Sequence, residues 1–189
     1  MLAAFLAGLA LVLGLVVYVA GRSSLPIGAA VTAVGGPFHL EDQDGKPFSD
    51  ADMKGRPFLV FFGFTHCPDI CPTTLFDISE VLRRLGKDAD RTGAVFITVD
   101  PDRDTPEMLK SYLSSFDPHL RGLTGDPAAI NAALKAYRVY AKKIPLEDGD
   151  YTMDHTAAVY LMDKNGRFVT TFNLKRTPEA AAEELRRYL

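Results

Sequence analysis

The feature that most limits the fold of this chain is a buried strand that leads into an amphipathic helix. The run FLVFFGF, residues 58–64, is continuously apolar, which is typical of a strand buried on both faces. Downstream, Leu75, Ile78, Leu82 and Leu85 are spaced as on one face of a helix. A strand of this kind lies in the middle of a sheet that helices cover, so the pattern predicts an α/β fold.

The rest of the chain continues this alternation of strands and helices. Further elements are expected as strands over residues 94–100, 157–163 and 167–173 and as helices over residues 109–116, 130–137 and 178–189. Asn165-Gly166, between the last two strands, is a hairpin signal, so this pair is antiparallel and the sheet is mixed. Asp44-Gly45 predicts an extra N-terminal β-hairpin within residues 36–49.

The N-terminal segment has the composition of a membrane span. The first 20 residues carry no charged side chain, and Arg22 is the first charged residue. A helix over this run is long enough to cross a hydrocarbon core about 30 Å thick. A cleaved signal peptide is less favoured, because its apolar part is usually shorter and because Tyr18, two residues before Ala20, makes a poor cleavage site.

We therefore expect a transmembrane anchor over residues 1–21, a Gly- and Pro-containing linker over 22–35 and one domain over 36–189. An N-terminus this short favours a single-pass protein of the inner membrane whose domain faces the periplasm or its equivalent. The net charge is −3, and lysines and arginines are scattered. The absence of a basic stripe in the sequence argues against a nucleic-acid partner.

The only two cysteines, Cys67 and Cys71, lie in the turn GFTHCPDICPTTL between the first strand and its helix, which is the thioredoxin-like arrangement. A permanent disulfide would close a very short loop and stabilise little. A redox-active pair is favoured more, because a helix N-terminus lowers the pKa of a thiol. Three residues separate the cysteines, and Pro68 and Pro72 stiffen the turn, so the spacing also leaves room for an ion.

A third metal ligand would have to come from one of the four histidines. His66 adjoins Cys67, and neighbouring side chains on extended backbone diverge. His39 belongs to the N-terminal hairpin, and His119 is expected in an exposed turn. His155 differs, because it precedes a strand at the point where a thioredoxin-like fold brings a loop beside the thiol turn. The alternative for His155 is a partly buried histidine with no ligand role.

The chemistry of these residues restricts the metal. Two thiolates and one imidazole suit Cu(I) in a three-coordinate site and also tolerate Cu(II). Zinc needs a fourth ligand, for which Asp69 is a candidate. Outside the cytoplasm thiols are exposed to oxidation, so the pair would switch between a metal-loaded dithiol and an empty disulfide.

The stretch DPDRDTP, residues 100–106, has aspartates at alternate positions, like the start of a calcium loop. Thr105 stands where the tight-turn glycine is needed and Ser111 where the bidentate glutamate is needed, so calcium is not expected. One interpretation is a strand-ending turn in which Thr105 caps the next helix and Pro106 opens it. The other is an acidic loop that faces a partner.

Three blocks resemble the signatures of the SCO/SenC family, in the right order and spacing over residues 36–189: GFTHCPDICPTTL, VDPDRDTPE and DYTMDHTAAVYLMDKNGRF. These are membrane-anchored, thioredoxin-like proteins of cytochrome c oxidase assembly. The resemblance implies copper ligation by Cys67, Cys71 and His155. It also implies delivery of copper, or of reducing equivalents, to the binuclear copper site of oxidase subunit II, with another periplasmic copper chaperone as a candidate donor.

Three hypotheses of different class follow. The first is a copper chaperone that performs no turnover and is therefore not an enzyme. The second is a thiol-disulfide oxidoreductase that uses Cys67 and Cys71 to keep the oxidase copper-site cysteines reduced, without a ligand role for His155. The third is a thiol peroxidase, which needs an arginine beside its reactive cysteine. Arg56 is the nearest candidate for that arginine in the sequence.

Overall fold

The computed structural model of this chain describes residues 34–147 and 149–189. The expected anchor over residues 1–21 and most of the expected linker over 22–35 lie outside these ranges. Within them, no helix is both long enough and apolar enough to cross a bilayer.

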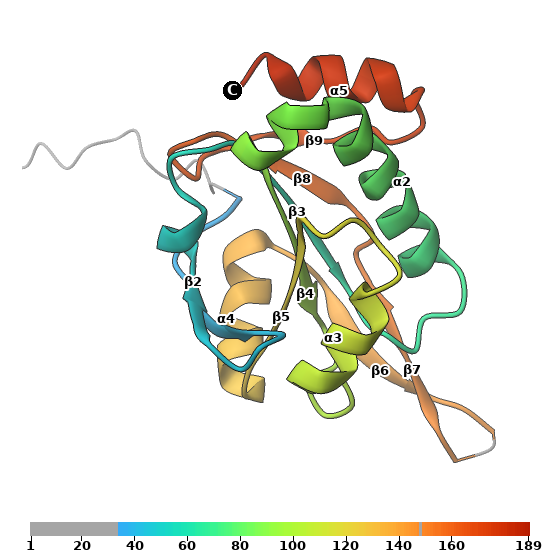
Figure 1. The fold of residues 1–189 in the computed structure, drawn as a ribbon. Helices are drawn as coiled ribbons and strands as arrows, with labels where there is room; N and C mark the ends of the chain where they lie inside the picture. The colour runs from blue at the N-terminus through green and yellow to red at the C-terminus, as the bar shows by residue number, and fades with distance from the viewer. Residues whose placement is uncertain (1–33, 148) are drawn as a thin grey trace, which may run out of the picture. The chain divides into compact units, whose positions relative to one another are not determined.

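A mixed β-sheet forms the centre of the described domain (Figure 1). Seven strands of the described residues take part, in the spatial order β2 (Pro47–Ser49), β1 (His39–Asp42), β5 (Leu120–Thr124), β4 (Gly93–Thr98), β3 (Phe58–Gly63), β8 (Val159–Met162) and β9 (Phe168–Thr171). β3, β4 and β5 are parallel, whereas β8 is antiparallel to β3 and β9 is antiparallel to β8. The mixed sheet expected from the sequence is therefore confirmed.

The N-terminal strands extend the sheet on one side. β1 pairs antiparallel with β2 and with β5. The chain turns between β1 and β2 at Gly45, whose φ of +71° lies in the left-handed region that glycine adopts without a steric penalty.

Helices cover both faces of the sheet. They are α2 (Ile70–Leu85), α3 (Pro106–Leu113), α4 (Pro127–Tyr137) and α5 (Pro178–Arg186), with short 3-10 turns η1 (Asp50–Met53) and η2 (Gly86–Arg91). The ring of Phe96 lies between those of Phe61 and Tyr112 of α3, whereas the ring of Phe62 packs on Tyr137 of α4. Because successive strand residues point to opposite faces, α3 and α4 lie on opposite sides of the sheet. α2 packs against α5.

A second, two-stranded sheet projects from the domain (Figure 1). It consists of β6 (Ala141–Pro145) and β7 (Tyr151–His155), paired antiparallel so that Ala141 lies opposite His155. The sequence pattern did not predict this hairpin, because its side chains are half-buried or exposed and no strong apolar alternation marks it. It matters for function, since His155 is its last residue.

Candidate metal centre

Cys67, Cys71 and His155 come from three different local structures. Cys67 lies in the turn after β3, Cys71 in the first turn of α2 and His155 at the end of β7. The Sγ atom of Cys71 lies 3.8 Å from Nε2 of His155, although the two residues are 84 positions apart in the sequence. The fold therefore brings the predicted histidine to Cys71, one of the two predicted thiols.

Cys67 contacts Cys71 through the backbone at the start of α2. The N–H of Cys71 donates a hydrogen bond of 3.4 Å to Sγ of Cys67. The first amides of a helix have no partner within the helix, and Asp69, the N-cap residue, makes no capping bond with its side chain. The sulfur of Cys67 thus takes the place of a capping oxygen, and both cysteines are free thiols.

Burial decides the protonation of Cys71. Its side chain is 0% exposed, and this burial raises the pKa of the thiol far above its ordinary value. A backbone N–H from Phe64 opposes the increase, whereas the nearby Cys67 and Asp104 add to it. The expectation that the helix N-terminus lowers the pKa is therefore wrong for Cys71, because loss of water outweighs the helix dipole. Metal-free Cys71 is a neutral thiol at pH 7.

His155 is held as a neutral imidazole. Burial lowers its pKa, and a hydrogen bond to the carbonyl of Thr156 together with the charge of Asp154 acts in the opposite direction. Nδ1 lies 3.1 Å from that carbonyl oxygen, so this nitrogen carries the proton. Nε2 then presents its lone pair toward Cys71, and the imidazole packs edge-on against Phe64. This is the protonation state that a metal ligand needs.

Cys71 contacts each of the other two residues: its N–H bonds Sγ of Cys67, and its Sγ approaches Nε2 of His155. Among residues 34–147 and 149–189, no three His, Cys, Asp or Glu side chains converge as a complete ligand set. The other candidate ligands are exposed or hydrogen-bonded to other residues. His39 and His66 are exposed, His119 is hydrogen-bonded to Asp90 and Asp117, and Asp69 is exposed at the helix start.

The aspartates of residues 100–106 do not form a calcium loop. Asp100 and Asp104 are 0% exposed and their carboxylates accept hydrogen bonds from neighbouring side chains. Only Asp102 of the three is exposed, where it pairs with Lys143. Thr105 accepts a hydrogen bond from the N–H of Met108 and caps α3, so the interpretation as a capping turn is confirmed.

The sequence analysis did not predict the contact of Asp104 with the turn before Cys67. Its carboxylate accepts hydrogen bonds from the hydroxyl of Thr65 at 2.6 Å, the N–H of Thr65 at 3.1 Å and the hydroxyl of Thr98 at 2.6 Å. Burial raises the pKa of this carboxyl, and the bonds from the two threonines oppose that increase. Thr65 and Asp104 are 39 positions apart in the sequence, so no local pattern predicts their contact.

The structure argues against a peroxidase arrangement. Arg56 precedes the first residue of β3, whereas Cys67 follows its last residue. A strand of six residues spans about 20 Å, so Arg56 lies at the opposite end of the sheet from the thiols. It lines a pocket with Thr92 and His119 instead.

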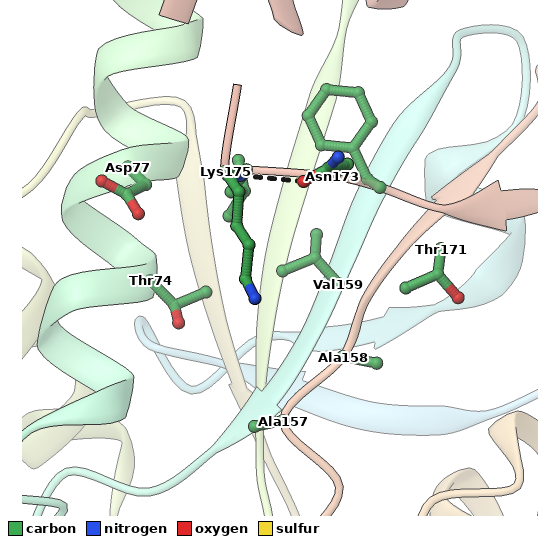
Figure 2. Close-up of a pocket in the computed structure, with 10 residues that line it drawn as sticks. Thr74, Asp77, Ala157, Ala158, Val159, Thr171, Asn173 and Lys175 are labelled. Atoms are coloured by element: carbon green, nitrogen blue, oxygen red, sulfur yellow. Dashed lines mark hydrogen bonds between the residues drawn. The ribbon is translucent and has the colours of Figure 1, made fainter. Parts of the chain in front are cut away.

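A groove of about 540 Å³ lies beside the candidate centre, between α2 and the segments around β8 and β9 (Figure 2). Thr74 and Asp77 border it from α2, and Lys175 reaches into it from the loop after β9. The N–H of Lys175 donates a hydrogen bond of 2.9 Å to Asn173 (Figure 2). No cysteine or histidine is among the described residues that line this groove, so it is separate from the candidate centre.

Comparisons with known proteins place this chain among relatives of one family. A family model described as SCO1/SenC matches residues 28–189. The SCO2-like protein of Rickettsia felis is 41% identical over 155 residues, which cover 81% of this chain and 76% of that protein.

Two of the solved structures that share the fold illustrate the range of similarity. The copper-bound structure of ScoI from Bradyrhizobium japonicum is 68% identical, with a TM-score of 0.81 over 83% of this chain and 100% of that one. BsSco, described with a disulfide switch and as a member of the Sco family of cytochrome c oxidase assembly proteins, is 25% identical, with a TM-score of 0.66 over 85% of this chain and 95% of its own.

Proposed function

This chain belongs to the SCO1/SenC family, and from that membership and the geometry we propose that it is a copper chaperone whose ligands are Cys67, Cys71 and His155. The observation that carries the proposal is the 3.8 Å approach of Sγ of Cys71 to Nε2 of His155. ScoI of Bradyrhizobium japonicum, a similar protein, has been solved with copper bound.

The donor set fits the ion. Two sulfurs and one imidazole nitrogen are the soft and borderline ligands that Cu(I) prefers, and the same set tolerates Cu(II). Cys71 gives up its proton when the ion binds, and His155 already presents a free Nε2. A three-ligand site leaves a coordination position open to an incoming cysteine or histidine, which suits a protein that transfers copper without turnover chemistry.

The proposed acceptor is the binuclear copper site of cytochrome c oxidase subunit II, and the proposed donor is another periplasmic copper chaperone. In this proposal residues 1–21 anchor the chain in the inner membrane, residues 22–35 are a linker and residues 36–189 face the periplasm. Tethering beside a membrane-bound acceptor raises the effective concentration of each protein for the other. Mass spectrometry of the native protein tests the anchor, because a mature N-terminus near residue 21 contradicts it.

A second candidate function is thiol-disulfide exchange, which would keep the cysteines of the oxidase copper site reduced. Two observations favour it. Sγ of Cys67 lies close enough to accept a hydrogen bond from the N–H of Cys71. BsSco, a similar protein, is described with a disulfide switch. In this function His155 has no ligand role.

Competition titration with a chromogenic Cu(I) chelator tests the ligand set and separates the two functions. We expect one tight site in the wild type, its loss in Cys67→Ala and Cys71→Ala, and weaker binding in His155→Ala. His39→Ala is the matched control, because His39 is an exposed histidine of β1. Unchanged copper affinity in His155→Ala removes this residue from the site and favours the exchange function.

A further inference from the structure

We infer that one loop, residues 98–105, positions both halves of the proposed copper site, with Asp104 fixing the turn before Cys67 and Asp100 with Arg103 fixing the strand before His155. The inference rests on the proposed ligand set. The ligands come from two segments 84 residues apart, and neither segment is a strand of the main sheet.

Asp104 makes the contact with the turn before Cys67. Its Oδ1 accepts the hydroxyl hydrogen of Thr65 at 2.6 Å, and its Oδ2 accepts the hydroxyl of Thr98 at 2.6 Å and the N–H of Thr65 at 3.1 Å. A buried carboxylate with three donors is costly to move, because any lost bond leaves charge without a partner in the protein interior. Thr65 is thereby fixed two residues before Cys67.

Asp100 and Arg103 make the contact with Tyr151, the first residue of β7. Asp100 is 0% exposed, accepts the hydroxyl of Tyr151 at 2.8 Å and accepts Nε of Arg103 at 2.5 Å. Arg103 also donates to the carbonyl of Tyr151 at 3.0 Å, and its guanidinium carbon lies 3.8 Å from the centre of the Tyr151 ring. Tyr151 is thus held through its hydroxyl, its ring and its backbone.

This second contact fixes a segment that has little support of its own. Tyr151 opens β7 and His155 closes it, and β7 pairs only with β6 in the part of the chain described. A two-stranded hairpin is marginally stable in water, so its position depends on what holds it to the domain. The loop over 98–105 supplies such a support and, through Asp104, connects it to the cysteine turn.

Two conservative variants test the inference. Thr65→Val removes the hydroxyl that bonds Asp104, and Tyr151→Phe removes the hydroxyl that bonds Asp100. Thr92→Val is the matched control, because Thr92 is buried and its hydroxyl likewise donates a hydrogen bond, to the carbonyl of Asp88 at 3.1 Å. Thr92 precedes β4, at the end of the sheet away from the thiols.

Two measurements are made on each variant: Cu(I) affinity by competition, and amide hydrogen exchange of the reduced, metal-free protein. We expect Thr65→Val and Tyr151→Phe each to weaken copper binding about tenfold, as loss of a supporting contact in a metal site does. Exchange should accelerate at residues 65–67 only in Thr65→Val and at residues 151–155 only in Tyr151→Phe. Thr92→Val should show neither effect, and Thr65→Ser should restore the wild-type values.

A purely structural role would lower the urea midpoint of Thr65→Val and Tyr151→Phe. It would also accelerate exchange throughout the domain, with no local pattern, and that result overturns the inference.

Arg103→Lys gives a second test of the contact with β7, because lysine keeps the charge but cannot bond Asp100 and the Tyr151 carbonyl with one planar group. If the wild type binds no copper, the proposed function fails. The exchange pattern still decides whether the loop fixes the two segments.

Discussion

Gly63 and Cys71 approach each other so closely that no side chain fits between them. A Cβ atom on Gly63 would lie 2.7 Å from Sγ of Cys71 and 2.7 Å from the ring of Phe96. The last residue of β3 therefore has to be glycine for the buried sulfur to occupy its position at the start of α2.

Gly63→Ala should consequently destabilise the protein and weaken copper binding together. Overpacking a core costs about 1–3 kcal/mol, and here the sulfur of Cys71 is one of the two groups that must move, with the ring of Phe96. Gly122→Ala is the matched control, because its Cβ would lie 2.7 Å from a methyl of Leu113, away from the thiols. Urea unfolding and Cu(I) competition check both variants. An equal loss of affinity in the two variants contradicts a specific effect on Cys71.

Copper affinity should rise with pH across the neutral range. Burial raises the pKa of Cys71, so the metal-free protein carries a thiol there and binding releases its proton. The pKa of His155 is lowered below 6.5, so this imidazole is already neutral at pH 7 and releases none. Each proton released makes the apparent affinity about tenfold higher per pH unit.

Competition titrations between about pH 6.5 and pH 8 measure this slope, with the chelator corrected for its own protonation. Cys71→Ala should lower the slope by about one proton, as judged from whatever weaker binding it retains. A wild-type affinity that does not change with pH would show that Cys71 is already a thiolate or is not a ligand.

Oxidation should abolish Cu(I) binding. The N–H of Cys71 contacts the sulfur of Cys67, so the two residues are neighbours at the start of α2 and a disulfide between them is expected on oxidation. A disulfide removes both thiolate donors, and reduction restores them. Cu(I) titration of the oxidised protein and of the same sample after reduction checks this, and equal affinity in the two states would refute the coupling.

Loss of the protein should impair the assembly of cytochrome c oxidase at limiting copper. We expect oxidase activity to fall in a deletion strain and added copper to restore part of it. A Cys67→Ser/Cys71→Ser copy should not complement, whereas a Thr92→Val copy should. Full oxidase activity with the double serine variant defeats the proposed acceptor.

The sequence predicted the central architecture because the main strands are strongly patterned. β3 is buried at every residue, and α2 carries an apolar stripe, so strand, thiol turn and helix could each be assigned from local spacing. The hairpin of β6 and β7 was missed for the opposite reason, since its residues are largely exposed or half-buried. A local sequence pattern predicts a strand from its buried apolar side chains, and this hairpin has no fully buried side chain.

The site could be predicted only in part. The two cysteines are neighbours in sequence, whereas the approach of His155 to Cys71 spans 84 residues and was expected only from a thioredoxin-like arrangement. The role of Asp104 and the direction of the pKa shift of Cys71 depend on depth in the folded protein. Sequence spacing places a thiol at a helix end but does not say how much water reaches it.

The unequal exposure of the two cysteines has a consequence for kinetics. Cys71 is fully buried, whereas Cys67 is partly exposed. If copper is held as proposed, a partner reaches the ion from the side of the half-buried Cys67 and His155, so the bond to the buried sulfur of Cys71 would break last. The dwell time of the ion would then be a property of the inner sulfur, and the rate of capture a property of the two outer ligands.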